Sequence, residues 1–138
     1  MIEEIKKLIQ SNIDTKDGIL INYNIDEYIL KLDKYATILT YYSKAQLIGF
    51  IAYYSNDFTN RTAYLTMIII DKRNRGEGLG KLLLKSSIYD LSHRGFKNFK
   101  LEVLKDNLKA IKIYEKFGFE IEEDRDNMWL LNLNIINE

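Results

Sequence analysis

Apolar positions follow a helical period in four parts of the chain and a strand-like pattern in six others. The helical spacing predicts helices over residues 2–10, 26–32, 78–94 and 107–117. Runs of aromatic and β-branched residues predict strands over residues 37–42, 47–54, 63–70, 99–104, 119–123 and 128–135. The end of the third strand is continuously apolar, which indicates that it is buried on both faces.

Local signals mark the ends of these elements. Asn24 or Asp26 is expected to cap the second helix and Asn107 the fourth, because short polar side chains satisfy the first free backbone N–H groups. Gly95 and Gly118 stand where the third and fourth helices should stop.

The order of the elements predicts the fold class. The passage from strand through long helix to strand over residues 63–104 predicts a right-handed parallel crossover. Residues 43–46, and the short segment between the last two strands, predict antiparallel hairpins. We therefore expect an α/β fold with a mixed, mostly antiparallel central sheet of six to seven strands and helices on both faces. The 138 residues show no linker and no repeat, so we expect one domain over residues 1–138.

Composition then narrows the classes of function that the chain could have. Twenty Lys and Arg residues balance twenty Asp and Glu residues, which argues against a general nucleic-acid binder. The absence of cysteine excludes thiol nucleophiles, disulfides and cysteine-bound metals, and His93 alone cannot form a His-rich site, so no metal is expected. No apolar run reaches the roughly 20 residues of a membrane span, and the charged residues 1–7 do not resemble a signal peptide. These features predict a cytoplasmic protein with no membrane partner.

The most informative segment is residues 70–82, IDKRNRGEGLGKL, which links a buried strand to the long helix. Gly76, Gly78 and Gly80 allow the backbone to approach a ligand closely. Free N–H groups at the helix start and the positive end of the helix dipole favour an anion. Positive charge is added there by Arg73, Arg75 and Lys81. The loop is therefore interpreted as a diphosphate site rather than a plain connector.

Two familiar phosphate loops do not fit this segment. A dinucleotide loop needs G-x-G-x-x-G, whereas these glycines alternate with single residues. A P-loop needs four residues between its first glycine and Gly-Lys, and then Ser or Thr to reach magnesium. Here three residues separate Gly76 from Gly80, and Leu82 follows Lys81. This argues against a nucleotide-dependent phosphotransferase.

Two blocks of the sequence resemble the GNAT family of N-acetyltransferases. Residues 75–80, RGEGLG, match the family signature R/Q-x-x-G-x-G/A, and residues 107–119, NLKAIKIYEKFGF, resemble its N-x-x-A-x-x-x-Y-x-x-x-G-F helix. The blocks have the family's order and separation and cover residues 63–119 with the strand before them. Lys72 stands where the family often has proline. The resemblance implies the acyl-CoA N-acyltransferase fold.

The resemblance also implies acetyl-CoA as the acetyl donor, held between two parallel strands that splay apart. The loop would bind the pyrophosphate, a strand edge would pair with the pantetheine arm, one of its N–H groups would polarise the acetyl carbonyl, and an asparagine would bond the pantetheine. The cofactor-binding residues it assigns are Ile68, Ile69, Ile70, Arg75, Gly76, Glu77, Gly78, Leu79, Gly80, Lys81, Asn107 and Lys116.

Catalysis of acetyl transfer needs a base for the amine and an acid for the leaving thiolate. The motif places Tyr114 as the acid, although Tyr114 also belongs to an apolar helical stripe and could simply pack. Glu102, between Leu101 and Val103, is the candidate base, because burial in a short strand would raise its pKa. It could equally point to solvent.

Other candidates belong to the acceptor side. Asp57 is a rival base or a substrate anchor, and Tyr28 and Tyr53 are candidate substrate contacts with it. The sequence thus predicts direct N-acetyl transfer from acetyl-CoA to a primary amine: a small amine, an amino sugar or a peptide N-terminus. The alternative is a non-catalytic acyl-CoA-binding or sensor module of the same fold. A homodimer through a free strand edge stays open.

Overall fold

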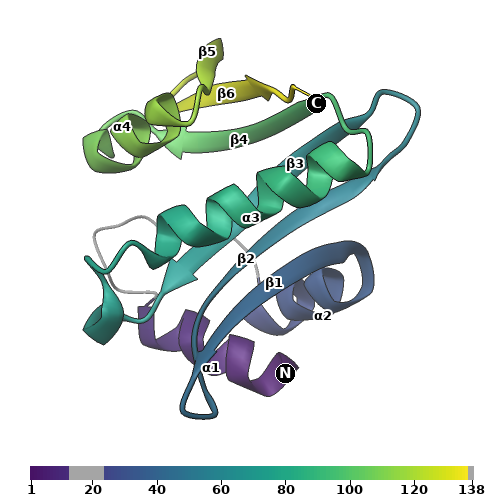
Figure 1. Ribbon diagram of the computed structural model, residues 1–138. Helices are drawn as coiled ribbons and strands as arrows, with labels where there is room; N and C mark the ends of the chain where they lie inside the picture. The colour runs from purple at the N-terminus through teal and green to yellow at the C-terminus, as the bar shows by residue number, and fades with distance from the viewer. Residues whose placement is uncertain (13–23, 137–138) are drawn as a thin grey trace.

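The computed structural model describes residues 1–12 and 24–136, and Figure 1 shows their arrangement. Within these ranges the helices are α1 (Ile2–Asn12), α2 (Ile25–Tyr35), α3 (Leu79–His93) and α4 (Leu108–Lys116), with a short 3-10 turn, η1 (Lys72–Asn74). The strands are β1 (Ala36–Ser43), β2 (Gln46–Asp57), β3 (Thr62–Ile70), β4 (Asn98–Leu104), β5 (Glu120–Arg125) and β6 (Met128–Asn134).

The strands form one six-stranded sheet in the order β1-β2-β3-β4-β6-β5. Neighbouring strands are antiparallel except for β3 and β4, which are parallel and joined through α3. This confirms the predicted mixed sheet and the parallel strand–helix–strand passage.

Most element ends also agree with their sequence signals. The side chain of Asn24 accepts a hydrogen bond from the Asp26 N–H, and the side chain of Asn107 accepts one from the Ala110 N–H. Gly95 and Gly118 have φ values of +77° and +101°, the left-handed backbone that stops a helix at glycine.

The connection between the strands predicted over residues 47–54 and 63–70 is shorter than expected. Strand β2 continues to Asp57, which pairs with Thr62 after a shift in register. Likewise α2 continues to Tyr35, and β1 starts at the next residue. Backbone pairing across the hairpin overrides the polar side chains of Asn56 and Asp57, because outward-facing residues of a strand end can stay solvated.

Helices cover both faces of the sheet, as predicted. Helices α1 and α2 lie on one face, which we call the α1–α2 face, where Ile5, Ile9 and Leu32 pack with Phe50 and Ile69. Helix α3 lies on the opposite face, the α3 face, and α4 flanks the far end of β4 (Figure 1). A second buried cluster joins α3 to the strands, with Leu84, Leu91, Phe96, Phe99 and Leu131 among its members.

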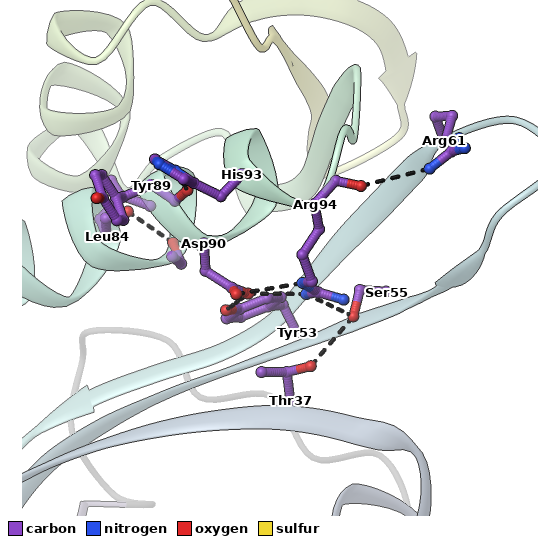
Figure 2. Close-up of polar contacts among 10 residues, drawn as sticks. Thr37, Tyr53, Ser55, Arg61, Leu84, Tyr89, Asp90, His93 and Arg94 are labelled. Carbon is purple, nitrogen blue, oxygen red and sulfur yellow. Dashed lines mark hydrogen bonds and ion pairs between the residues drawn. The ribbon is translucent and has the colours of Figure 1, made fainter. Parts of the chain in front are cut away.

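A polar network ties the C-terminal half of α3 to the sheet (Figure 2). The Tyr53 hydroxyl donates to Asp90 Oδ2 at 2.6 Å, and Arg94 Nη2 donates to the same oxygen at 2.8 Å. Arg94 also donates to Ser55, which is 3.0 Å away and bonds Thr37 on β1. Burial alone would raise the pKa of Asp90, but the hydrogen bonds from Arg94 and Tyr53 outweigh it and hold that pKa below its usual range. The network holds α3 in place over β2.

Candidate active site

The two parallel strands separate in the middle of the sheet. Strand β3 pairs with β4 only at Thr62↔Asn98, Ala63↔Phe99 and Tyr64↔Lys100. Beyond Tyr64 no pairing between the two strands is found among the described residues, although both continue. Figure 1 shows them diverging toward their C-terminal ends, beside the start of α3 and beside α4. The sheet therefore offers an unpaired strand edge at its centre.

The backbone of β3 decides which groups face this gap. The Asp71 N–H donates to the Ile48 carbonyl on β2, and bonded and non-bonded pairs alternate along an antiparallel ladder. The next pair, Gly49↔Ile70, is therefore a non-bonded pair, and Phe50↔Ile69 after it is a bonded one. The backbone groups of Ile69 thus point toward β2, and those of Ile68 and Ile70 point away from it. Of the predicted strand edge, Ile68 and Ile70 thus face the gap and Ile69 does not.

A bulge lies where the two strands part. The β2–β3 ladder pairs Tyr53 with Leu65 and Ala52 with Met67, so Thr66 is an extra residue on β3. Leu65 consequently packs in the core under α3, whereas Met67 packs in the core under α1 and α2.

The glycine loop leads from the end of β3 into α3. Gly76 and Gly78 have φ values of +85° and +81°, and Gly78 caps the helix without any side-chain hydrogen bond. The first-turn N–H groups at Leu79, Gly80 and Lys81 thus have no capping side chain, and the positive end of the helix dipole lies there. The arrangement suits an anion with several oxygen atoms.

Arginines around this loop have defined partners. Arg75 Nε donates to the Ile70 carbonyl at 3.1 Å, and its Nη2 donates to Asn12 Oδ1 at 2.7 Å. Arg75 therefore ties the loop to the end of β3 and to α1. The guanidinium of Arg73 pairs with Asp71, and its hydrogen bond lowers the pKa of that carboxyl. Glu77 in the loop and Lys81 in the first turn of α3 are both exposed.

Helix α4 carries three predicted residues. Asn107 uses Oδ1 to cap the helix at 3.3 Å from the Ala110 N–H, which leaves its amide NH₂ as the donor for a ligand. The Tyr114 ring packs edge-on against Phe119 with a centroid distance of 5.6 Å, and burial raises the pKa of Tyr114 to about 12. Packing and acid chemistry are therefore compatible at Tyr114. Lys116 is exposed in the last turn.

Glu102 lies on β4, on the face opposite α3. Its neighbours Leu101 and Val103 are buried in the α3-side core, so strand alternation directs Glu102 to the α1–α2 face. Of the two orientations that the sequence left open, the structure shows the solvent-facing one: Glu102 is exposed, because α1 and α2 pack on β1 to β3 and leave this part of β4 uncovered. It nevertheless has polar partners, since the Tyr64 hydroxyl donates to Oε1 at 2.7 Å and Arg125 Nη1 lies 3.7 Å from Oε2.

The structure does not bring Tyr28, Tyr53 and Asp57 together. Tyr28 lies on the α1–α2 face and its hydroxyl bonds Thr66 on β3 at 2.8 Å. Tyr53 is fully buried on the α3 face in the network of Figure 2, because alternation along β2 turns it away from Tyr28. This corrects its expected place in an acceptor pocket.

Asp57 is also remote from the gap. It pairs with Thr62 at the beginning of β3 and accepts hydrogen bonds from the backbone and side chain of Asn60. Thr62 is level with Asn98 on β4, and Glu102 lies four residues after Asn98. About four residues of strand rise, ~13 Å, therefore separate Asp57 from Glu102 along the strand direction. The structure thus favours Glu102 over Asp57 as the carboxylate at the gap.

Tyr64 is a site residue that sequence reasoning missed. Its position two residues before the bulge, and level with Lys100, follows from sheet register, which the sequence pattern does not contain. The available signal was its place in the strand before the glycine loop, between Ala63 and Leu65, whose apolar side chains leave Tyr64 to face the other side of the sheet.

Among residues 1–12 and 24–136, no group of three or more His, Asp or Glu side chains could hold a metal ion. In the same part of the chain no helix is long and apolar enough to cross a membrane.

Comparison with known proteins agrees with this geometry. The sequence model of the acetyltransferase (GNAT) family matches residues 5–119. A spermine/spermidine N(1)-acetyltransferase from Bacillus subtilis strain 168 is 34% identical over 91 residues, which cover 62% of this chain and 60% of that protein. The match thus spans about 60% of the length of this curated relative.

Solved structures share the fold over nearly the whole chain. The ribosomal-protein-S18-alanine N-acetyltransferase from Escherichia coli superposes with a TM-score of 0.79 at 19% identity, covering 97% of this chain and 87% of that one. PaiA N-acetyltransferase from Thermoplasma acidophilum, solved with coenzyme A, gives a TM-score of 0.77 at 18% identity, with 96% and 92% covered. Both carry a mixed α/β architecture of the same class.

Proposed function

The chain belongs to the acetyltransferase (GNAT) family, and on that premise we propose that it transfers the acetyl group of acetyl-CoA directly to a primary amine. One observation carries the proposal: an unpaired strand edge and a helix start suited to anions open side by side where β3 and β4 part. A thioester on a long arm that ends in a diphosphate needs both features together.

The residues on the α3 side would bind the donor. The N–H groups at the start of α3 would hold the pyrophosphate, and Gly76 and Gly78 keep the loop in the left-handed conformation that exposes them. The free backbone groups of Ile68 and Ile70 would pair with the pantetheine arm as an added strand does. The amide of Asn107 would donate to the same arm, and Lys116 would reach a phosphate.

The reaction joins the amine nitrogen to the acetyl carbon and breaks the carbon–sulfur bond. The Ile68 N–H would donate to the carbonyl oxygen as negative charge develops there. Glu102 would take a proton from the acceptor ammonium, directly or through one water, which frees the nitrogen lone pair to attack the acetyl carbon. Tyr114 would give its proton to the departing thiolate. Its pKa, raised to about 12, supports this role, because it keeps the phenol protonated at neutral pH.

The acceptor would reach Glu102 from the α1–α2 face, opposite the donor-binding loop. This separation supports direct transfer, since both substrates meet at the gap without sharing a path. The absence of cysteine removes the usual nucleophile for an acyl-enzyme intermediate.

Calorimetric titration with acetyl-CoA tests the donor site. We expect saturable one-to-one binding to the wild-type chain and its loss in Gly78→Trp, whose side chain would occupy the open space over the loop. No binding at millimolar acetyl-CoA would refute the proposal.

Thiol release then tests turnover, and the cysteine-free chain adds no background signal. Spermidine and a peptide with an N-terminal alanine are the first acceptors to try, because relatives with those substrates share the family or the fold. Acetyl-CoA binding without turnover on a broad amine panel would indicate an acyl-CoA-binding module instead.

A further inference from the structure

We propose that Tyr64 is a positioning residue that holds the Glu102 carboxylate in one orientation, with Oε1 bound by the phenol and Oε2 left to take the proton from the acceptor amine. This inference rests on the proposed function, because Tyr64 is the hydrogen-bond partner of Glu102, the base in that function.

The position of Tyr64 makes it suited to this task. Tyr64 is the last residue of β3 that pairs with β4, so its backbone is held on both sides just before the strands part. Glu102 follows two residues after Lys100, the partner of Tyr64, on the same face of the sheet. The phenol therefore reaches across the start of the gap from a rigid strand, and its oxygen lies 2.7 Å from Oε1.

The phenol also stays a donor under working conditions. Burial, followed by its hydrogen bond to Glu102, raises the pKa of Tyr64, so the hydroxyl keeps its proton throughout the neutral and moderately alkaline range. A protonated phenol can only donate to an ionised carboxylate, so the observed bond from Tyr64 to Oε1 keeps one direction, with the phenol as donor.

The second carboxylate oxygen has a weaker partner. Arg125 Nη1 lies 3.7 Å from Oε2, beyond hydrogen-bond length, while Arg125 Nε donates to Glu123 Oε2 at 3.1 Å. Arg125 lies on the exposed edge strand β5. If its guanidinium moves away from Glu102, it still has Glu123 as a partner. An ammonium group can therefore replace the guanidinium at Oε2 without leaving a charge unpaired.

Fixing this side chain matters because it is exposed. A free glutamate at a surface samples many rotamers, and ordering it costs side-chain entropy. A general base must lie within about 2.6–3.2 Å of the proton it removes, directly or through one water. The Tyr64 bond orders Glu102 before the acceptor arrives, so this entropy is lost on folding and not in the reaction.

The test compares Tyr64→Phe with Tyr42→Phe as a matched control. Tyr42 also donates to a glutamate, Glu4, at 3.1 Å, but on β1 at the outer edge of the sheet. With acetyl-CoA and spermidine, we expect Tyr64→Phe to lower kcat about tenfold, a fraction of what loss of a general base costs. The KM and Kd for acetyl-CoA should not change, and Tyr42→Phe should behave as wild type.

Glu102→Ala separates this inference from the proposed function. If Tyr64 acts through Glu102, Tyr64→Phe causes no further loss when combined with Glu102→Ala. If Tyr64→Phe lowers activity equally in the wild-type and Glu102→Ala backgrounds, the inference is overturned. It is also overturned if Tyr64→Phe is fully active while Glu102→Ala is impaired. The assignment of Glu102 as the base survives either result. Full activity of Glu102→Ala overturns the base assignment itself.

A second measurement needs no acceptor. NMR relaxation of the Glu102 carboxyl carbon in glutamate-labelled protein reports how freely that group moves. We expect restricted motion in wild type and in Tyr42→Phe, and fast motion in Tyr64→Phe. Equal restriction in all three chains would overturn the positioning role.

Discussion

Alanine at the two glycines that flank the start of α3 should have opposite effects. Gly78 has a φ of +81° and no atom within 4 Å of an added Cβ, so only backbone conformation opposes a side chain there. An L-residue in the left-handed region costs about 1–2 kcal/mol. For a chain of this size, that cost lowers the melting temperature of Gly78→Ala by about 3–8 °C.

Gly80 has an ordinary helical conformation in the first turn of α3. Its added Cβ would meet Ile70 Cγ1 at 3.9 Å, a normal van der Waals contact. Replacing a helical glycine by alanine stabilises a helix by roughly 0.5–1 kcal/mol. We therefore expect Gly80→Ala to melt about 2–4 °C above wild type.

Acetyl-CoA affinity should separate the same pair. The family signature requires glycine at the position of Gly78 and accepts alanine at that of Gly80. Loss of the left-handed turn would misdirect N–H groups worth about 1.5–3 kcal/mol each toward a charged oxygen, so Gly78→Ala should weaken binding roughly 10- to 100-fold. Gly80→Ala should bind as wild type does.

Thermal unfolding followed by circular dichroism, together with calorimetric titration, measures both quantities. A Gly78→Ala chain as stable as wild type would refute the argument from backbone conformation. Equal loss of binding in both variants would show that the loop recognises its ligand through close approach at Gly80 rather than through the turn at Gly78.

Three further predictions follow from particular contacts. Tyr53→Phe removes a 2.6 Å bond to Asp90 and should cost about 1.5–3 kcal/mol in urea unfolding at neutral pH. The pKa of Asp90 is lower in the folded than in the unfolded chain, so Asp90 stabilises the fold above its unfolded pKa and loses this effect as pH falls through its folded pKa. The stability difference between Tyr53→Phe and wild type should therefore shrink in acid, and a constant difference would contradict this. Gly49→Ala should destabilise by about 1–3 kcal/mol in the same assay, since its Cβ would lie 2.6 Å from Ile70 Cδ1 and 2.9 Å from the Ile69 carbonyl oxygen; an unchanged midpoint would show that β3 can yield. Tyr114→Phe should lower kcat in the thiol-release assay and leave the Kd for acetyl-CoA unchanged, and unaltered turnover would remove Tyr114 from the mechanism.

Local structure was predictable because its causes are local. Asn107 as a helix cap, Gly118 as a helix stop and the left-handed glycines before α3 depend on residues only a few positions apart. Hydrophobic periodicity likewise predicted the order of helices and strands and the parallel crossover. The glycine loop could therefore be interpreted as an anion site from the sequence, and the resemblance to the GNAT family extended that interpretation to the α4 block.

The acceptor side depended on long-range register instead. Alternation along one strand is readable from sequence, but the bulge at Thr66 changes which face each later residue of β3 occupies, and periodicity does not locate such a bulge. Tertiary pairing alone ended the β3–β4 contact at Tyr64 and placed that phenol on Glu102. The sequence by itself thus determined the elements and the glycine loop that starts α3, whereas the sheet decided which carboxylate stands at the gap and what holds it there, because pairing energies between distant strands set the register.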